Sequence, residues 1–356
     1  MRPKQLKDLR KEIDGIDSRI IELINRRGKA SRTIGEIKKS KKQPIYSPDR
    51  ESHIYARITR KNKGPLPDES VRAIYSEIMS ACLSLEHPMV VAYLGPELTF
   101  THQAALKKFG SSVNYLSCDS ISDVFHEVQK GNADYGVVPI ENSTEGAVNH
   151  TLDMFIDSPL LICSEVSLPI HHSLLCAKSN MKSINVLYSK VEVFGQCRKW
   201  IEKNLPAAKL YQVASTAKAA EIASKHPDSA CIASELAGKK FRLKILAKSI
   251  EDSARNVTRF LIIGNEMSVV SGKDKTSILF SVKDKPGVLH DMLNSFKRKG
   301  INLTKIESRP TKEKLGKYYF FIDMDGHCES SKVKTALRDL EKKCHFVKIL
   351  GSYPKG

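Results

Sequence analysis

The sequence predicts a multidomain protein in which an all-α segment, an α/β segment and an α+β segment follow one another. Three patterns predict this fold class: a proline-free stretch with helical spacing at 4–42, apolar runs alternating with helical stretches at 88–268, and a strand-rich pattern with two helices at 275–356. With 356 residues the chain is long enough for several buried cores. Domains are expected at 1–87, 88–268 and 275–356.

The first segment begins with one long helix. Two shorter helices follow at about 49–61 and 67–86, after prolines that end the long one. Apolar residues recur along the long helix at steps of three and four, as in a coiled-coil seam: Leu6, Leu9, Ile13, Ile16, Ile20 and Leu23. Gly28 and Gly35 each weaken that helix by ~1 kcal/mol, so packing must hold it. Because three helices with one very long member bury their apolar stripe poorly, we expect an intertwined dimer through the long helix.

The second segment has α/β organisation. Helical stretches such as 120–129 and 215–225 separate its apolar runs, which are 90–94, 113–116, 135–139, 160–166, 174–177, 210–213, 230–233 and 260–264. No glycine-rich dinucleotide motif or P-loop follows these strands, so no nucleotide cofactor is expected. One run breaks at Pro139 into a polar loop, which either is an ordinary capped turn or delivers side chains to a crevice at the strand ends.

The third segment has the βαββαβ order of a ferredoxin-like fold. Its elements are expected at 276–282, 286–299, 301–308, 317–324, 331–342 and 346–350. Pro286 suits the first turn of the first helix, and Gly300 suits its left-handed stop.

Charge and cysteine content exclude several functional classes. The net charge of +18 divides into about +8, +1 and +9 for residues 1–87, 88–270 and 271–356, without the arginine-rich tracts or interleaved aromatics of nucleic-acid binders. Steering of anionic metabolites accounts for it. Eight scattered cysteines lack metal-site spacing and are expected to be reduced and mostly buried. The N-terminus is charged and no run reaches membrane-spanning length, so we expect a cytoplasmic protein without metal, membrane or nucleic acid.

Cations on the long helix could form a binding site. Arg27 and Lys38 are eleven residues apart, which places them ~20° from the same helix face. Arg10 lies about 25 Å further along the axis, so it could join them only from the partner in an antiparallel dimer. A solvated basic face is the commoner explanation of such a pattern.

Residues 4–86 resemble the all-helical chorismate mutases. The resemblance is carried by Leu-Arg-Lys-Glu-Ile-Asp, Asn-Arg-Arg, Ile-Gly…Lys, Asp-Arg-Glu and the closing Met-Ser-Ala-Cys-Leu-Ser-Leu-Glu. It implies a clamp on the two carboxylates of chorismate by Arg27 and by Arg10 of the partner chain. It also implies that Lys38 and Glu86 address the ether oxygen as catalytic residues, that Glu51 meets the ring hydroxyl, and that Arg50 orients Glu51.

Three positions depart from the mutase pattern. Ser47 stands where Asp is usual, Cys82 where Ser is common, and Glu86 where Gln is common. A glutamic acid can donate a hydrogen bond to the ether oxygen only when it is protonated. The implied substrate-binding set is Arg10, Arg27, Lys38, Ser47, Arg50, Glu51, Cys82 and Glu86.

The α/β segment resembles prephenate dehydratase over its whole length. Supporting motifs include Val-Pro-Ile-Glu-Asn-Ser, Tyr-Leu-Gly-Pro-Glu-Leu-Thr-Phe-Thr, His-His-Ser-Leu, Gln196-Cys197 and Asn256-Val-Thr-Arg-Phe. The resemblance implies a two-lobed domain in which the hydroxyl of Thr258 is essential. It also implies a set of substrate-binding residues: Thr99, Glu141, Asn142, Ser143, His171, Ser215, Arg259 and Phe260. Leu98 departs from the family's usual Gly, a change that bears on the path of its loop.

The last segment resembles an ACT regulatory domain. Two stretches correspond to its ligand segments, and a helix N-terminus in one of them suits an amino-acid carboxylate. They are Gly287, Val288 and Leu289 at the helix start, and Glu307, Ser308, Arg309 and Pro310 on the next strand. A helix cap beside an ordinary strand would explain either stretch alone, but both together behind a dehydratase favour L-phenylalanine as an effector.

Together the resemblances imply a bifunctional enzyme, an isomerase that converts chorismate to prephenate and a lyase that converts prephenate to phenylpyruvate. It is expected to be a homo-oligomer, either a dimer or a tetramer, in L-phenylalanine biosynthesis under phenylalanine feedback. A non-catalytic two-lobed binding protein and a basic nucleic-acid regulator are the alternatives. The first leaves the helical segment unexplained, and the second lacks a suitable charge pattern.

Overall fold

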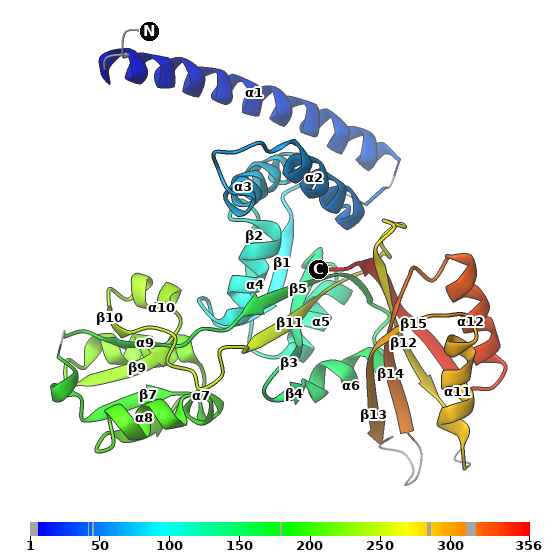
Figure 1. Cartoon of the computed structure of the whole chain (residues 1–356). Coiled ribbons are helices and arrows are strands. Elements are labelled where there is room, and N and C mark those ends of the chain that lie inside the picture. The colour runs from blue at the N-terminus through cyan, green and yellow to red at the C-terminus, as the bar shows by residue number, and fades with distance from the viewer. Residues whose placement is uncertain (1–5, 42, 45, 179, 283–285, 311–317) are drawn as a thin grey trace. The chain divides into compact units, whose positions relative to one another are not determined.

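The structure, a computed structural model, describes residues 6–41, 43–44, 46–178, 180–282, 286–310 and 318–356 (Figure 1). The chain divides into two compact units. The first comprises Met1–Val90 and Lys108–Asn114, and the second comprises Val91–Lys107 and Tyr115–Gly356. No helix in the described ranges is long and apolar enough to cross a membrane.

Three helices make up most of the first unit: α1 (Leu6–Ser40), α2 (Pro48–Lys61) and α3 (Asp68–Glu86). All three were predicted, although the outer bounds 4 and 42 of the first one lie outside the described residues. Pro48 occupies the start of α2, where its missing N–H costs nothing. The apolar seam of α1 is largely exposed in the single chain, with Leu6 65% and Ile13 55% accessible.

Small residues bring α1 against α3. Gly28, Ser31 and Gly35 are buried and recur at helical spacing on one face of α1. A Cβ on Gly35 would lie 2.8 Å from the Cα of Glu86, and a Cβ on Gly28 would lie 3.2 Å from Leu85 Cδ1. The glycines that weaken the isolated helix are therefore what allows close packing in the folded unit.

The second unit contains two α/β lobes. The first lobe has a sheet in the order β2-β1-β3-β11-β5, with β4 paired to β3. Its strands are β1 (Val90–Leu94), β2 (Asn114–Cys118), β3 (Tyr135–Asn142), β4 (Gly146–Ala147), β5 (Leu161–Pro169) and β11 (Val257–Gly264). Its helices are α4 (Phe100–Phe109), α5 (Ile121–Gln129) and α6 (Asn149–Asp157). The late strand β11 lies between β3 and β5 and is antiparallel to both.

The second lobe has a sheet in the order β10-β6-β9-β7-β8. The strands are β6 (Ser173–Cys176), β7 (Val186–Ser189), β8 (Lys209–Gln212), β9 (Ser229–Ala233) and β10 (Lys244–Ala247). The helical elements are the single-turn η1 (Met181–Ser183), α7 (Val191–Gln196), α8 (Arg198–Asn204), α9 (Thr216–Lys225) and α10 (Glu235–Lys240). The chain enters this lobe after β5 and returns to the first lobe as β11 (Figure 1).

Two strands of the second lobe were not predicted. β7 and β10 are each four residues long, and their apolar content is too brief to separate them from loop sequence. The eight predicted runs all coincide with strands, within a few residues at their ends. The predicted α/β organisation is confirmed.

The C-terminal part of the second unit is a four-stranded sheet with two helices. Its order, β13-β14-β12-β15, is that of a ferredoxin-like fold, as predicted. The elements are β12 (Asp274–Ser281), α11 (Val288–Lys297), β13 (Leu303–Pro310), β14 (Tyr318–Asp325), α12 (Ser331–Glu341) and β15 (Phe346–Pro354). Residue 317, the expected start of the third strand, lies outside the described ranges.

The start of α11 differs from the prediction. Pro286 lies in a turn before the helix, and Gly287 is the N-cap residue, with φ +76°. The helix begins at Val288 because the left-handed backbone of Gly287 reverses the chain first.

Leu98 keeps a backbone path that usually requires glycine. Its φ is +73°, which costs a non-glycine residue about 1–2 kcal/mol. The side chain is buried in one apolar cluster with Leu175 and Ala217. Burial of a leucine contributes about 1.5–3 kcal/mol and offsets that strain.

All eight cysteines are free thiols, and seven are buried, as predicted.

Candidate active sites

A cavity of about 110 Å³ lies in the helical unit. Seven of the eight residues that the mutase resemblance implies line it: Arg27, Lys38, Ser47, Arg50, Glu51, Cys82 and Glu86. The spacing of Arg27 and Lys38 on α1 had predicted their convergence. Arg10 is exposed on the same helix, about 25 Å from Arg27 along the axis.

Helix α3 holds the cations of α1 in place. Lys38 Nζ lies 3.5 Å from Glu86 Oε2, and both side chains are mostly buried. Arg27 Nη1 is 3.5 Å from the carbonyl oxygen of Ile78. Both contacts depend on the close approach of the two helices at Gly35, which a larger side chain would prevent.

Glu51 has two partners that the sequence did not identify. The hydroxyl of Tyr46 donates to Glu51 Oε2 at 2.5 Å, and Lys108 Nζ lies 2.8 Å from the same oxygen. Arg50 was expected to orient Glu51, but the described contacts come from Tyr46 and Lys108. Tyr46 lies in the linker before α2, and Lys108 lies in α4, in the segment expected to belong to the next domain.

The cavity has an excess of positive charge. Among the described lining residues are two carboxylates, Glu51 and Glu86, and four permanent cations: Arg27, Lys38, Arg50 and Lys108. A net charge of about +2 in a partly desolvated cavity favours a ligand with two carboxylates. The remaining lining is apolar or weakly polar, including Ile54, Met79 and Phe109.

Thr258 belongs to a hydrogen-bonded group of side chains in the second unit. It is on β11, directly opposite Asn142 of β3. Asn142 Nδ2 donates to Thr258 Oγ1 and to Asn256 Oδ1, both at 2.8 Å. Asn142 Oδ1 accepts from the backbone N–H and the hydroxyl of Thr144. These partners fix the amide so that its nitrogen faces Thr258.

Gln196 connects this group to the other lobe. It ends α7, accepts from Asn256 Nδ2 at 3.0 Å and donates to Glu145 Oε1 at 2.5 Å. His172 Nε2 lies 2.8 Å from the same Gln196 oxygen, which requires a ring proton on Nε2. Burial lowers the pKa of His172, so the ring is neutral near pH 7.

Gln196, Asn256 and His172 were not among the predicted site residues, although the dehydratase motifs contain all three. His171 was predicted, but it pairs with Glu251 at 2.8 Å and its side chain is 56% exposed. Neighbouring residues point in different directions, so a His-His motif does not say which ring enters a site.

Other predicted residues hold local structure. Thr99 donates to the carbonyl of Leu94, and Ser215 caps α9 by accepting from the backbone N–H of Lys218. Ser143 donates to the carbonyl of Arg255 and accepts from the backbone N–H of Val257, which fastens the loop to β11. Phe260 is 1% exposed in the interior of the sheet.

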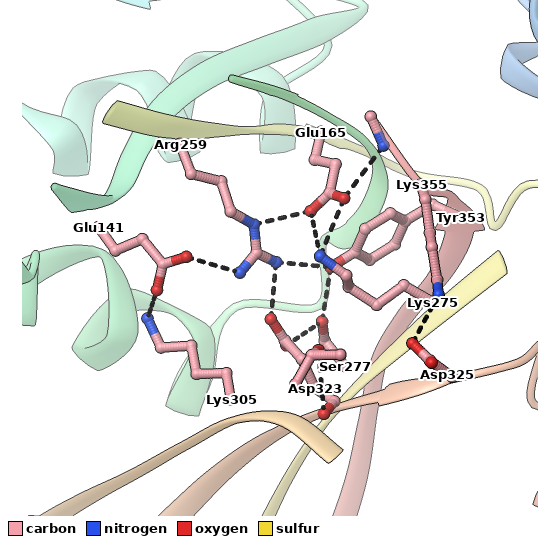
Figure 2. Close-up of polar contacts among 12 residues, drawn as sticks. Glu141, Glu165, Arg259, Lys275, Ser277, Lys305, Asp323, Asp325, Tyr353 and Lys355 are labelled. Carbon is pink, nitrogen blue, oxygen red and sulfur yellow. Dashed lines mark hydrogen bonds and ion pairs between the residues drawn. The ribbon is translucent and has the colours of Figure 1, made fainter. Parts of the chain in front are cut away.

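Arg259 and Glu141 form a second pair beside Thr258 and Asn142. The four residues are cross-strand neighbours, Thr258 with Asn142 and Arg259 with Glu141. Because successive side chains of a strand point to opposite faces, Arg259 extends away from Thr258. Figure 2 shows its guanidinium among three carboxylates. Arg259 lies 2.7 Å from Glu165, 3.1 Å from Glu141 and 2.7 Å from Asp323 of β14.

Lysines complete this buried network (Figure 2). Lys305 of β13 donates to Glu141 at 2.5 Å, and Lys275 of β12 lies 2.9 Å from Glu165. Burial raises the pKa of Glu165, but Arg259 and then Lys275 outweigh burial and hold that pKa below its usual range. Burial likewise opposes ionisation of Glu141, whose pKa is lowered by Lys305 and Arg259.

The predicted effector residues lie on α11 and β13. Gly287 caps α11, and Arg309 on β13 makes a bidentate pair with Asp153 of α6, its nitrogens 3.0–3.3 Å from the carboxylate oxygens. Lys348 of β15 donates to three carbonyls at the C-terminal end of the same helix, those of Phe155, Ile156 and Ser158. The C-terminal sheet is thus attached to the first lobe by charged contacts.

Three family models match the chain. A chorismate mutase type II model matches residues 9–87, a prephenate dehydratase model matches 91–268, and an ACT domain model matches 276–342. These matches agree with the helical, two-lobed and ferredoxin-like parts of the structure.

Similar proteins span the whole chain. A bifunctional chorismate mutase/prephenate dehydratase of Aquifex aeolicus is 51% identical over 99% of this chain and 98% of its own length. One of the same description from Pseudomonas aeruginosa is 44% identical with the same coverage. The solved structure of a prephenate dehydratase from Arthrobacter aurescens in complex with L-Phe is 33% identical, with a TM-score of 0.70, and the match covers 75% of this chain and 90% of that one.

Proposed function

The chain belongs to the family of bifunctional chorismate mutase/prephenate dehydratases, and we propose that its two reactions take place in the helical cavity and at Thr258. It is an enzyme with an isomerase activity and a lyase activity in aromatic amino acid biosynthesis. We assign the mutase to residues 1–87, the dehydratase to 88–268 and the ACT regulatory domain to 275–356. The product of the second step is phenylpyruvate, formed with loss of carbon dioxide and water.

In the mutase, binding energy supplies the catalysis. The rearrangement of chorismate needs no nucleophile; it needs a compact conformer and donors directed at the ether oxygen, which gains charge as its bond to carbon stretches. Arg27 holds one substrate carboxylate, and Lys38, which is paired with Glu86, donates to the ether oxygen. Glu51 accepts from the ring hydroxyl. The excess positive charge of the cavity supports this assignment.

A second copy of the chain completes the mutase cavity. The exposed apolar seam of α1 supports dimerisation, because monomeric soluble proteins rarely expose an apolar stripe of that length. In an antiparallel dimer Arg10 of one copy lies beside the cavity of the other and binds the second substrate carboxylate.

In the dehydratase, Thr258 donates to the departing hydroxyl of prephenate. Asn142 donates to the Thr258 oxygen, so the hydroxyl hydrogen of Thr258 is directed toward another acceptor. Aromatisation of the ring provides the driving force, and a positioned donor rather than a strong acid suffices. The hydrogen-bonded group around Thr258 is the observation that carries this assignment.

L-Phenylalanine binds the ACT domain and inhibits the dehydratase. The L-Phe complex of the Arthrobacter relative and the ACT match support this proposal. Binding changes the position of the C-terminal sheet, and the network of Arg259 carries that change to the strand that holds Thr258. Arg309→Ala tests the effector site better than a Gly287 variant, because φ +76° at Gly287 would strain any side chain.

One assay tests both activities. Purified protein is given chorismate or prephenate separately, and chorismate, prephenate and phenylpyruvate are followed together. We expect turnover of both substrates. A two-lobed binding protein or a nucleic-acid regulator would turn over neither.

A further inference from the structure

Helix α4 contributes two residues to the mutase cavity. Lys108 and Phe109 line it together with residues of α1, α2 and α3. Both lie in the range matched by the prephenate dehydratase model, beyond the residues matched by the chorismate mutase model. The residues that line the cavity therefore extend beyond the sequence range that the chorismate mutase model matches.

The side chain of Lys108 is held in a defined position. Its Nζ lies 2.8 Å from Glu51 Oε2, and the two side chains are only 15% and 12% exposed. The Lys108 ammonium is 5.9 Å from the ring centroid of Tyr46, and the Phe109 ring packs on the same tyrosine with centroids 5.1 Å apart. A buried, charge-assisted contact of this kind is stronger than an exposed surface ion pair.

The contact determines how Glu51 meets a ligand. Tyr46 and Lys108 both bind Oε2, so they hold that oxygen in place. In the part of the chain that the structure describes, Glu51 Oε1 has no donor. Without Lys108, Glu51 would keep only the Tyr46 hydroxyl as a donor, and its uncompensated charge would repel a ligand that itself carries two negative charges.

We propose that Lys108 is a positioning residue of the mutase reaction, which acts by holding the Glu51 carboxylate ready for the ring hydroxyl of chorismate. This inference rests on the proposed mutase function of the cavity. The mutase site then includes a side chain from the segment that otherwise belongs to the dehydratase.

The test is a double-mutant cycle in the full-length protein with Lys108→Ala, Glu51→Gln and the double variant. Mutase kcat and KM are measured with chorismate, and dehydratase kcat/KM with prephenate. We expect Lys108→Ala to lower mutase kcat/KM about 10- to 100-fold, the effect of one charge-assisted hydrogen bond. In the Glu51→Gln background the same change should cost less than about threefold, because Lys108 acts through Glu51.

Two further variants serve as controls. Lys108→Arg keeps the charge and should retain most of the activity, and Lys61→Ala removes an exposed lysine of α2 and should have no effect. Undiminished mutase activity in Lys108→Ala, or effects that multiply fully with Glu51→Gln, would overturn the proposal. Equal loss of dehydratase activity would also overturn it, since it would indicate general structural damage. A wild-type protein that does not turn over chorismate would instead refute the function of the cavity itself.

Discussion

The helical cavity gathers four cations and two carboxylates, whereas the site around Thr258 joins a hydroxyl, three amides, a neutral imidazole and one exposed carboxylate. We propose that the first arrangement holds a dianion by charge and shifts its conformation, and that the second positions a single donor by hydrogen bonds from two lobes. The difference follows the chemistry, because a pericyclic step needs compression and electrostatic stabilisation and an elimination needs a directed donor.

The two sites also differ in how they assemble. Three consecutive helices contribute most of the residues that line the cavity. We propose that a further cation, Arg10, comes from a second copy of the chain. The Thr258 site comes from strands far apart in sequence, and a charged network on the opposite face of β11 connects that strand to the C-terminal sheet (Figure 2). The following variants perturb one site or one connection at a time.

The largest effect is expected for the shared cavity. Arg10→Ala and Lys38→Ala should each lower mutase activity by about 100- to 1000-fold, as loss of a catalytic donor does. After subunit exchange about half of the dimers are heterodimers with one intact site, so mixing the two variants should restore about a quarter of wild-type activity. Mass spectrometry verifies the exchange. No recovery in a verified mixture would place Arg10 in its own chain's site.

A stability change tests the buried network. Glu165→Gln removes the carboxylate that pairs with Lys275 and leaves Arg259 with two of its three carboxylates, Glu141 and Asp323. Because Lys275 then lacks its buried counter-charge, the variant should destabilise the protein by about 3–5 kcal/mol. Because the folded-state pKa of Glu165 is lowered, its contribution is present above the unfolded pKa of about 4.3 and is lost as pH falls through the lower folded value.

Thermal unfolding of wild type and Glu165→Gln between pH 3 and 7 measures the contribution of Glu165 to stability. The difference between their midpoints should be largest near pH 7 and shrink on the acid side. Glu221→Gln is the control, because its lysine partners lie on the exposed surface of α9. A pH-independent difference would mean that the charge of Glu165 is not what stabilises the fold.

A smaller effect is expected on regulation. Asp323→Asn weakens the connection between β14 and Arg259, so inhibition of the dehydratase by L-phenylalanine should require about 5- to 10-fold more effector. Calorimetry should still detect phenylalanine binding. Asp325→Asn on the same strand is the matched control, since Asp325 pairs with Lys355 instead (Figure 2). Equal inhibition of the Asp323 and Asp325 variants by L-phenylalanine would show that the contact between Asp323 and Arg259 does not couple the effector site to the dehydratase site.

The smallest effect concerns Glu86. In the proposed complex its side chain faces the ether oxygen beside Lys38, and a glutamine there offers an N–H donor. Glu86→Gln should therefore keep or raise mutase activity and leave dehydratase activity unchanged, as steady-state kinetics with chorismate and with prephenate measure. A large loss of mutase activity in the Gln variant would show that Glu86 does not face the ether oxygen.

Much of the cavity was predictable because its parts are local. Helical periodicity placed Arg27 and Lys38 on one face, and the structure brings both into one cavity. Lys108 was not predictable, since its approach to Glu51 depends on tertiary packing of α4 and no pattern near either residue indicates it.

The Thr258 site shows what strand patterns leave open. The strands themselves followed from apolar runs, but their order did not, because β11 inserts between two strands that precede it by a hundred residues or so. Strand alternation could have indicated that Arg259 and Thr258 face opposite ways. No sequence pattern could have shown that Gln196 of the second lobe reaches Asn256.

Thr258→Ala tests most directly whether one chain carries two separate sites. Chorismate, prephenate and phenylpyruvate are followed together with the wild-type protein and with this variant at equal concentrations. We expect phenylpyruvate formation to fall about 100- to 1000-fold while chorismate is consumed at the wild-type rate and prephenate accumulates. Loss of chorismate consumption as well, in a variant with wild-type unfolding behaviour, would contradict the assignment of the two reactions to separate sites.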